Sequence, residues 1–294
     1  MKNTTLTAVA LISLVALASC GNTAQGKVHK AKEVAADVLL PPEQEEQLGV
    51  EFQKELNTQL KYHPNPNVQA YIQALGNRVV QHAQKDAPDI SFEFRVVDDA
   101  ETINAFAIPG GAIYIYSGLL ANADNEAEVM GVLGHEVAHV TERHIAERLV
   151  TANGINLVTS MALGKDPAMV GQILGSVAGQ GYLLKFGRDQ EREADVRGFD
   201  YMVKAGYDPE GMASFFSKLA AMQGGASQPS FLASHPNPGE RAQTIRSMIA
   251  KRQNLPDFKG DARYAEFKPS LRVSSDVQTA ATPTTPTTTP ASLK

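Results

Sequence analysis

The sequence of 294 residues has a single cysteine, Cys20. One cysteine cannot form an intramolecular disulfide or a cysteine-rich zinc module, so any bound metal must be held by His, Asp or Glu side chains. The sequence also lacks a long run of Lys or Arg, and its formal net charge is -5, which argues against a nucleic-acid partner. With 43% hydrophobic and 20% charged residues, the composition is that of a globular protein rather than a disordered chain, a coiled coil or collagen.

No apolar run has the features of a lipid-facing transmembrane helix. Residues 6–18 are apolar, follow the positive Lys2 and are too few to cross a bilayer as a mature helix, so they predict a secretory signal. Residues 167–184 are uncharged, but they contain four glycines and two glutamines, and their hydrophobicity is weak for a membrane span. We interpret them as a buried or site-covering helical segment, with membrane association as the alternative.

The lone cysteine lies directly after the apolar stretch. The sequence LASC at positions 17–20 resembles the bacterial lipobox, which implies that the chain is cut before Cys20 and that Cys20 is acylated. Several acyl chains on one residue anchor a soluble domain firmly. We therefore expect a lipoprotein signal peptide at 1–19 and a lipid-anchored tether at 20–40, with an ordinary signal peptide and a chance cysteine as the alternative. Gly21 in place of Asp resembles the default outer-membrane sorting signal, which implies a domain facing the periplasm.

Residues 41–272 alternate helix and strand patterns without repeats. Helical periodicity predicts helices over about residues 41–60, 66–83, 124–150, 188–205 and 210–222. Alternating apolar residues predict a small, mostly antiparallel sheet with strands near 92–96, 104–107 and 112–116. The predicted fold class is therefore α+β, mostly α. Residues 273–294 are dominated by Thr, Pro, Ala and Ser and cannot bury a core, so we expect a disordered tail.

The clearest chemical motif is His135-Glu136-Val137-Ala138-His139, within the predicted helix at 124–150. Residues four apart lie on one face of a helix, about 6 Å apart along the axis, so both imidazoles can reach one cation. Glu136 lies about 100° around the helix from His135, where its carboxylate can reach an activated water without being a ligand. This arrangement suits a zinc hydrolase, which needs one further protein ligand and an open position for water.

The third ligand must come from elsewhere in the chain. The metzincin pattern is excluded because Glu142 and Ile145 stand where that class has Gly and His, and His144 has rotated to another part of the helix. Downstream, Glu191 and Asp195 lie four apart on a second predicted helix and share a face, whereas the glutamate between them points elsewhere. Either carboxylate can bind the metal. A solvated charged helix face is the alternative.

Together the two motifs, HExxH and RxxExxAD, resemble the gluzincin metallopeptidases that include HtpX, the CAAX prenyl proteases and a periplasmic lipoprotein branch. The similarity covers about residues 40–250, including the segments 104–107, 109–111, 117–120, His235-Pro236 and Arg241. It implies a zincin-like helical metalloprotease domain at 41–272, with a small antiparallel sheet beside the active-site helix. Because the sequence lacks the transmembrane helices of HtpX and a helical-repeat domain, we expect the compact lipoprotein branch.

The resemblance assigns roles residue by residue. It implies that one zinc ion per chain is bound by His135, His139 and Glu191. Glu136 is implied to take a proton from the attacking water and to return it to the leaving amine. Asp195 is implied to accept a hydrogen bond from a ligating imidazole and so to fix its tautomer.

Two further residues are candidates for the reaction itself. His235 and Arg241 can each donate to the developing oxyanion. In some periplasmic relatives the matching histidine occupies the open zinc position, so latency is an equally weighted role for His235, and a simple cap before Pro236 is a third interpretation. The strand at 112–116 is the expected edge at which an extended substrate pairs its backbone, with little sequence specificity.

These features predict a zinc-dependent endopeptidase of the bacterial cell envelope that hydrolyses unfolded, misfolded or misassembled envelope proteins. We expect it at the outer membrane, attached through lipidated Cys20 and facing the periplasm, with the outer-membrane assembly machinery as a candidate partner and no nucleic acid. The main alternative is a periplasmic chaperone or outer-membrane-protein assembly factor with little proteolysis. A lipoprotein whose zinc only braces the helices would leave Glu136 without a role.

Overall fold

A computed structural model describes residues 40–87, 89–153, 158, 160, 163–165, 168, 171–172, 185–225 and 229–272. The expected signal peptide, nearly all of the tether, the Thr/Pro-rich tail and most of the uncharged segment at 167–184 lie outside the described residues. Among the described helices, none combines the length and apolar character that a membrane crossing needs.

The described chain is mostly helical with one small sheet, so the predicted fold class is confirmed. The helices are α3 (Pro42–Gln59), α4 (Pro66–Ala83), α5 (Ser117–Asn122), α6 (Glu126–Thr141), α7 (His144–Asn153), α10 (Arg188–Lys204), α11 (Glu210–Ala221), α12 (Phe231–Ser234), α13 (Pro238–Ala250) and α14 (Asp261–Phe267). The strands are β1 (Glu93–Val97), β2 (Ala105–Ala107) and β3 (Ala112–Tyr116), and short 3-10 turns form η1 (Pro109–Gly111) and η3 (Lys268–Leu271).

The helix starts follow the capping residues of the sequence. Pro42 and Pro66 occupy the first turns of α3 and α4, where the missing N–H of proline costs no helical hydrogen bond. Asn125 caps α6 by accepting a hydrogen bond from the backbone N–H of Glu128, at 3.1 Å. The carboxylate of Glu128 accepts from the backbone N–H of Asp124 rather than from that of Asn125, so Asn125 and Glu128 do not form a reciprocal capping box.

The sheet is mixed, and the prediction of an antiparallel sheet is wrong for one of its two strand pairs. The strand order is β1-β3-β2, with β1 parallel and β2 antiparallel to β3. The tight turn at Gly110 and Gly111, whose φ angles are 79° and 95°, sends β3 back beside β2 and into the space next to β1. The strand at 112–116 is therefore central, not an edge, and its Tyr114 and Tyr116 are core residues.

The single helix predicted over 124–150 is broken into α6 and α7. Arg143 has a φ of 54°, a left-handed conformation that ends α6 and lets α7 start in a new direction. The guanidinium of Arg143 donates to the buried carboxylate of Glu45 on α3, at 2.9 Å, and to the carbonyl of Leu40. Contacts distant in sequence therefore stabilise a break that periodicity alone does not reveal.

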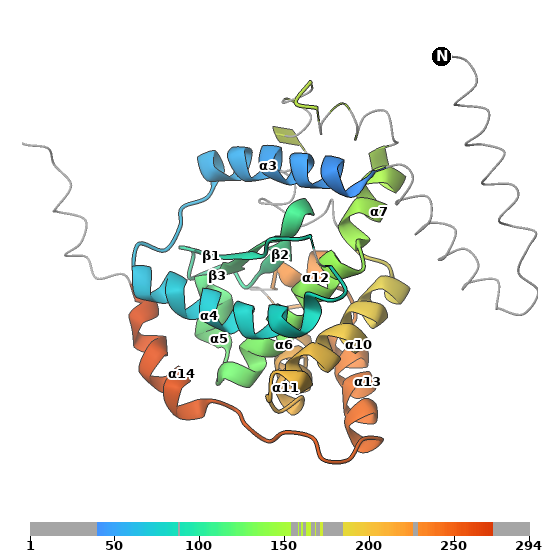
Figure 1. The fold of residues 1–294 in the computed structure, drawn as a ribbon. Helices are drawn as coiled ribbons and strands as arrows, with labels where there is room; N and C mark the ends of the chain where they lie inside the picture. The colour runs from blue at the N-terminus through green and yellow to red at the C-terminus, as the bar shows by residue number, and fades with distance from the viewer. Residues whose placement is uncertain are drawn as a thin grey trace, which may run out of the picture.

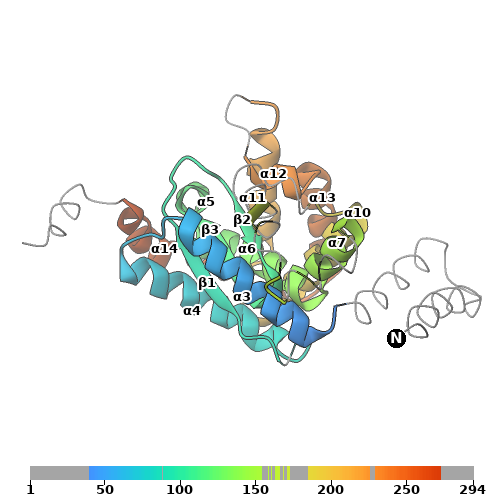
Figure 2. The same ribbon diagram turned by 90° about the horizontal axis from the view of Figure 1, so that it is seen from above.

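The HExxH helix α6 runs through the centre of the described fold. The sheet lies between α3 on one side and α4 with α6 on the other, and α10 and α11 pack along α6 (Figures 1 and 2). The backbones of α6 and α10 touch at Gly134 and Gly198, where a Cβ built on Gly198 would lie 2.7 Å from the carbonyl carbon of Gly134. This close approach brings the two sequence motifs together.

Candidate metal centre

The two histidines of the HExxH motif converge as their spacing predicts. His135 and His139 lie one turn apart on α6, and their Nε2 atoms are 3.0 Å apart. Both imidazoles are fully buried. Two unprotonated nitrogens at this separation repel each other unless a cation lies near both. The pair is therefore suited to hold one metal ion.

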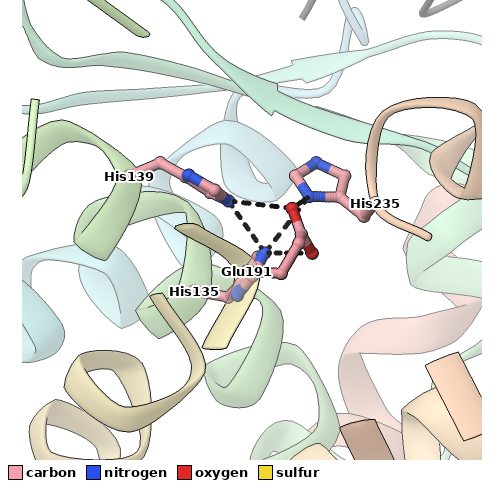
Figure 3. A group of neighbouring side chains, drawn as sticks. All are labelled: His135, His139, Glu191 and His235. Carbon is pink, nitrogen blue, oxygen red and sulfur yellow. Dashed lines mark hydrogen bonds and ion pairs between the residues drawn. The ribbon is translucent and has the colours of Figure 1, made fainter. Parts of the chain in front are cut away.

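Glu191 and His235 complete a cluster of four donors (Figure 3). Glu191 comes from the first turn of α10, and its carboxylate oxygens lie 3.6 Å from Nε2 of His139 and 3.7 Å from Nε2 of His135. His235 follows α12, and its Nδ1 lies 3.0 Å from Glu191 Oε1 and 3.2 Å from His135 Nε2. All four donor atoms lie within 4.8 Å of one another.

These separations fit a tetrahedral metal ion. Zinc bound to nitrogen and oxygen at about 2.0–2.2 Å in tetrahedral geometry has ligand-to-ligand distances of about 3.3–3.6 Å. Five of the six donor pairs, all but His139 with His235, are separated by 3.0–3.7 Å when either oxygen of Glu191 is used. All four donors lie within 4.8 Å of one another. Three imidazoles and one carboxylate are also ligand types that zinc accepts.

The protonation states of His135, His139 and Glu191 suit metal binding. Burial lowers the pKa of His135 to about 4 and holds the pKa of His139 well below its usual value, so both imidazoles are neutral. Burial on its own would raise the pKa of Glu191, but the neighbouring Arg241 guanidinium holds it well below the usual range. Metal ligands must be neutral imidazoles and ionised carboxylates, which is the state found here.

Arg241 and Asp195 lie directly behind the donors. Asp195 Oδ1 accepts from Nδ1 of His135 at 3.0 Å, which leaves the Nε2 lone pair free to face the cluster. Arg241 donates from Nε and Nη2 to the two oxygens of Asp195, at 2.8 and 2.7 Å, and its Nη1 lies 2.6 Å from Glu191 Oε2. The guanidinium also stacks over the Phe216 ring at 4.1 Å. Arg241 thus pairs with two carboxylates.

Glu136 lies beside the cluster without joining it. Its carboxylate accepts a hydrogen bond from the backbone of Ala107 on β2, and its Oε1 lies 3.5 Å from Nε2 of His235. Burial raises the pKa of Glu136 to about 7, against the opposing effect of His235. A carboxyl with this pKa can accept and release a proton near neutral pH.

Two residues that contact the cluster were missed by the sequence reasoning. The Nδ1 of His144 lies 3.0 Å from Nδ1 of His139, and the ring of Phe186 stacks on that of His139 with centroids 3.8 Å apart. His144 was expected to point away because the helix was expected to continue past Arg143. The glutamate between the two α10 carboxylates, Glu193, was expected to point elsewhere, but its Oε2 lies 3.5 Å from Nε2 of His144. No sequence signal marks Phe186.

Comparison with known proteins now identifies the family. The profile of peptidase family M48 matches residues 66–249, which is more than half of the chain and includes all four donors. The chain belongs to peptidase family M48. The resemblance to a gluzincin metallopeptidase family is thereby confirmed.

Several relatives of this M48 chain are metalloproteases by name. The beta-barrel assembly-enhancing protease of Yersinia pestis is 32% identical over 223 residues, which are 72% of this chain and 45% of that protein. The Escherichia coli metalloproteases YcaL and LoiP are 33% and 36% identical, over 60% and 51% of this chain and 66% and 60% of their own lengths. The chain spans less than half the length of the beta-barrel assembly-enhancing proteases that it matches.

Proposed function

We propose that this M48 chain is a zinc-dependent endopeptidase in which His135, His139 and Glu191 bind one zinc ion and Glu136 transfers protons. The observation that carries the proposal is the convergence of two neutral imidazoles and an ionised carboxylate on one buried point, with the carboxyl of Glu136 beside it. The family and the names of the relatives support the same activity.

The proposed chemistry follows from where these side chains lie. When bound, zinc supplies Lewis-acid chemistry that polarises the substrate carbonyl and lowers the pKa of a water molecule. Glu136 takes a proton from that water as its oxygen attacks the carbonyl carbon. The peptide carbon–nitrogen bond then breaks as Glu136 gives the proton to the leaving amine nitrogen. A pKa of about 7 allows this carboxyl to carry out both transfers near neutral pH.

For His235, the distances support latency over oxyanion stabilisation. Its Nδ1 lies as close to Glu191 and His135 as a fourth ligand of the same tetrahedral site would lie. A fourth protein ligand would exclude the water that hydrolysis needs. We propose that Arg241, which was a second oxyanion candidate, instead holds Asp195 and Glu191 in place, because its donors already face these carboxylates.

We assign substrate pairing to β2, since β3 is central in the sheet. The backbone groups of Ala105 and Ala107 point away from β3. The hydrogen bonds to β3 come from the alternate residues of this segment, as in the bond from the N–H of Ile108 to the carbonyl of Ala112 at 2.9 Å. An extended peptide added there would pass Glu136. The backbone N–H of Phe231 now bonds the carbonyl of Ile103 beside β2, at 3.1 Å, so α12 must move before a substrate pairs.

We further propose that the enzyme acts in the bacterial envelope on misfolded or misassembled proteins, anchored to the outer membrane through Cys20. The support is the lipobox-like sequence at 17–20 and the similarity to proteases named for enhancing beta-barrel assembly. Replacing Cys20 with Ser should leave the precursor uncut. Processing of the unmodified chain in the presence of globomycin would contradict lipoprotein maturation and favour an ordinary signal peptidase.

The direct test compares zinc content and casein cleavage between the unmodified chain and Glu136→Gln. The amide keeps the shape of Glu136 but cannot take a proton, so bound zinc should be retained and the cleavage rate should fall by about a hundredfold or more. Equal cleavage by both proteins would overturn the role of Glu136. Zinc binding without cleavage, even after His235 is replaced by Ala, would favour the chaperone or assembly-factor alternative.

A further inference from the structure

The imidazole of His139 has a second nitrogen whose partner the proposed reaction does not explain. Its Nε2 faces His135 and Glu191, so in the neutral ring that binds metal its Nδ1 carries the proton and needs an acceptor. The ring is fully buried, and a buried donor without a partner is costly. His135 donates from its Nδ1 to Asp195 at 3.0 Å. Asp195 also accepts from Arg241, so another residue must accept from His139.

His144 is the acceptor for His139. The Nδ1 atoms of the two rings are 3.0 Å apart, and His144 is 1% exposed. When Nδ1 of a neutral imidazole accepts, Nε2 carries the proton, so His144 must in turn donate from Nε2. That atom lies 3.5 Å from Oε2 of Glu193, at the outer limit of a hydrogen bond. Hydrogen bonds therefore run from His139 to His144 and from His144 to Glu193.

We propose that His144 and Glu193 are positioning residues that fix the tautomer and the orientation of His139 for metal binding. This inference rests on the proposed zinc site. The carboxylate of Glu193 strengthens His144 as an acceptor, and His144 makes the Nε2 lone pair of His139 more basic. Helix α10 then supports both histidines of the HExxH motif, one directly through Asp195 and one through Glu193 and His144.

The contact between His139 and His144 depends on the break between α6 and α7. If the helix continued, a residue five positions after His139 would point to a different side. The left-handed Arg143, with a φ of 54°, turns the chain so that His144 begins α7 with its ring against His139. Glu45 holds this turn through its hydrogen bond to Arg143.

The test measures zinc affinity of the full chain by competition with a chromophoric chelator, and the visible spectrum of the Co²⁺-substituted protein. His144→Phe keeps a ring but removes the acceptor, and should weaken zinc binding by about 10–100-fold and shift the Co²⁺ spectrum. His144→Asn places an amide oxygen where Nδ1 stands and should recover most of the affinity. Glu193→Ala should weaken binding, and Glu193→Gln, which keeps an acceptor, should weaken it less.

Asp200→Ala is the matched control for Glu193→Ala. Asp200 lies on the same helix, its side chain is 31% exposed against 33% for Glu193, and it forms an ion pair with Arg252 at 2.6 Å. This change should leave zinc affinity and the Co²⁺ spectrum as they are. Because Asp200 faces no residue of the cluster among the described contacts, a loss equal to that of Glu193→Ala would show a general effect of helix charge and overturn the proposal.

The remaining outcomes separate this inference from the proposed function. Unchanged affinity and spectrum in folded His144→Phe would overturn the positioning role while leaving the zinc peptidase intact. Equal losses in His144→Phe and His144→Asn would overturn it too, because packing alone would then explain them. If His144→Phe does not fold, the comparison of Glu193→Ala with Glu193→Gln tests the positioning role instead, and equal zinc affinity in Glu193→Ala and the unmodified chain would overturn it. A chain that binds zinc in this order of affinities but cleaves no unfolded protein, even after His235→Ala, would support the positioning role and refute the peptidase.

Discussion

At the scale of single residues, the centre depends on one cation that offsets two buried carboxylates. Arg241 is 6% exposed and pairs with both Asp195 and Glu191. Burying two negative charges without a partner is very unfavourable, whereas the Arg241 guanidinium makes a bidentate hydrogen-bonded pair with Asp195 and a close ion pair with Glu191. Arg241 therefore allows Glu191 and Asp195 to stay ionised inside the fold before any metal arrives.

Replacing Arg241 with Met should be among the most damaging single changes. Methionine fills similar space over Phe216 but leaves two buried carboxylates uncompensated, which we expect to cost about 3–5 kcal/mol in the free energy of unfolding. Urea unfolding of the metal-free protein measures this. Arg246→Met on the same helix is the control, because Arg246 and Glu210 form an exposed pair that contributes about 0–1 kcal/mol. A loss for Arg241→Met no greater than for the control would contradict the pairing role.

Residue patterns in the sequence predict part of this centre. The spacing of His135 and His139 is enough to place them on one helix face, and the resemblance to the family points to Glu191 and Asp195. The contact of His144 could not be predicted, because it depends on a left-handed Arg143 that is stabilised by Glu45, almost a hundred residues earlier in the chain. A helical projection treats residue 144 as part of a continuous helix and so points it away.

At the scale of elements, the centre is built where α6 and α10 meet without side chains between them. Gly134 precedes His135 directly, and Gly198 follows Asp195 by one turn of the helix. At the crossing, a Cβ on Gly134 would lie 2.8 Å from the carbonyl oxygen of Gly198. This separation is shorter than real Cβ contacts, so only glycine lets the two helices approach closely enough for Glu191 to reach the histidines.

Gly198→Ala should therefore move α6 and α10 apart and lower both the zinc affinity and the free energy of unfolding. Overpacking of this kind costs about 1–3 kcal/mol, measurable as a lower urea midpoint, and the altered distance of Glu191 should lower zinc affinity. Gly239→Ala in α13 is the control, because its Cβ would meet Ala220 at an ordinary 3.6 Å and helix propensity should keep or raise stability by about 0.5–1 kcal/mol. Normal zinc affinity in Gly198→Ala would argue against the crossing as the determinant of ligand geometry.

Helix positions were more predictable than strand directions. The bounds of α3, α4, α10 and α11 agree with the periodicity of the sequence within one or two residues, because proline starts and apolar faces are local signals. The sheet is different. The parallel pairing of β1 with β3 depends on the order in which three strands come together, and alternation of apolar residues carries no information about that order.

At the scale of the whole molecule, the described structure is closed around its centre. His135, His139, Glu136, Glu191 and His235 are each no more than 2% exposed. The segment that carries His235 contributes to this closure, since the backbone N–H of Phe186 bonds the carbonyl of Ser234 at 3.1 Å and Phe186 stacks on His139. This burial, together with the hydrogen bonds of the α12 segment to Ile103 and Phe186, is the arrangement that the proposed latency requires.

His235→Ala tests this latency. Without the imidazole, the fourth position of the site is open to water, so turnover of an unstructured substrate at neutral pH should rise when normalised to bound zinc. If His235 instead donates to the oxyanion, the same change should lower the rate by about a hundredfold or more with zinc still bound. A large fall would therefore mean that latency is wrong.

The central claim, that this cluster binds zinc, is tested most directly by zinc K-edge X-ray absorption of the purified full chain. The account predicts one zinc per chain with nitrogen and oxygen ligands at about 2.0–2.2 Å, and imidazole scattering from three rings that falls to two in His235→Ala. A sulfur ligand at about 2.3 Å, or fewer than two imidazoles in the unmodified chain, would contradict it.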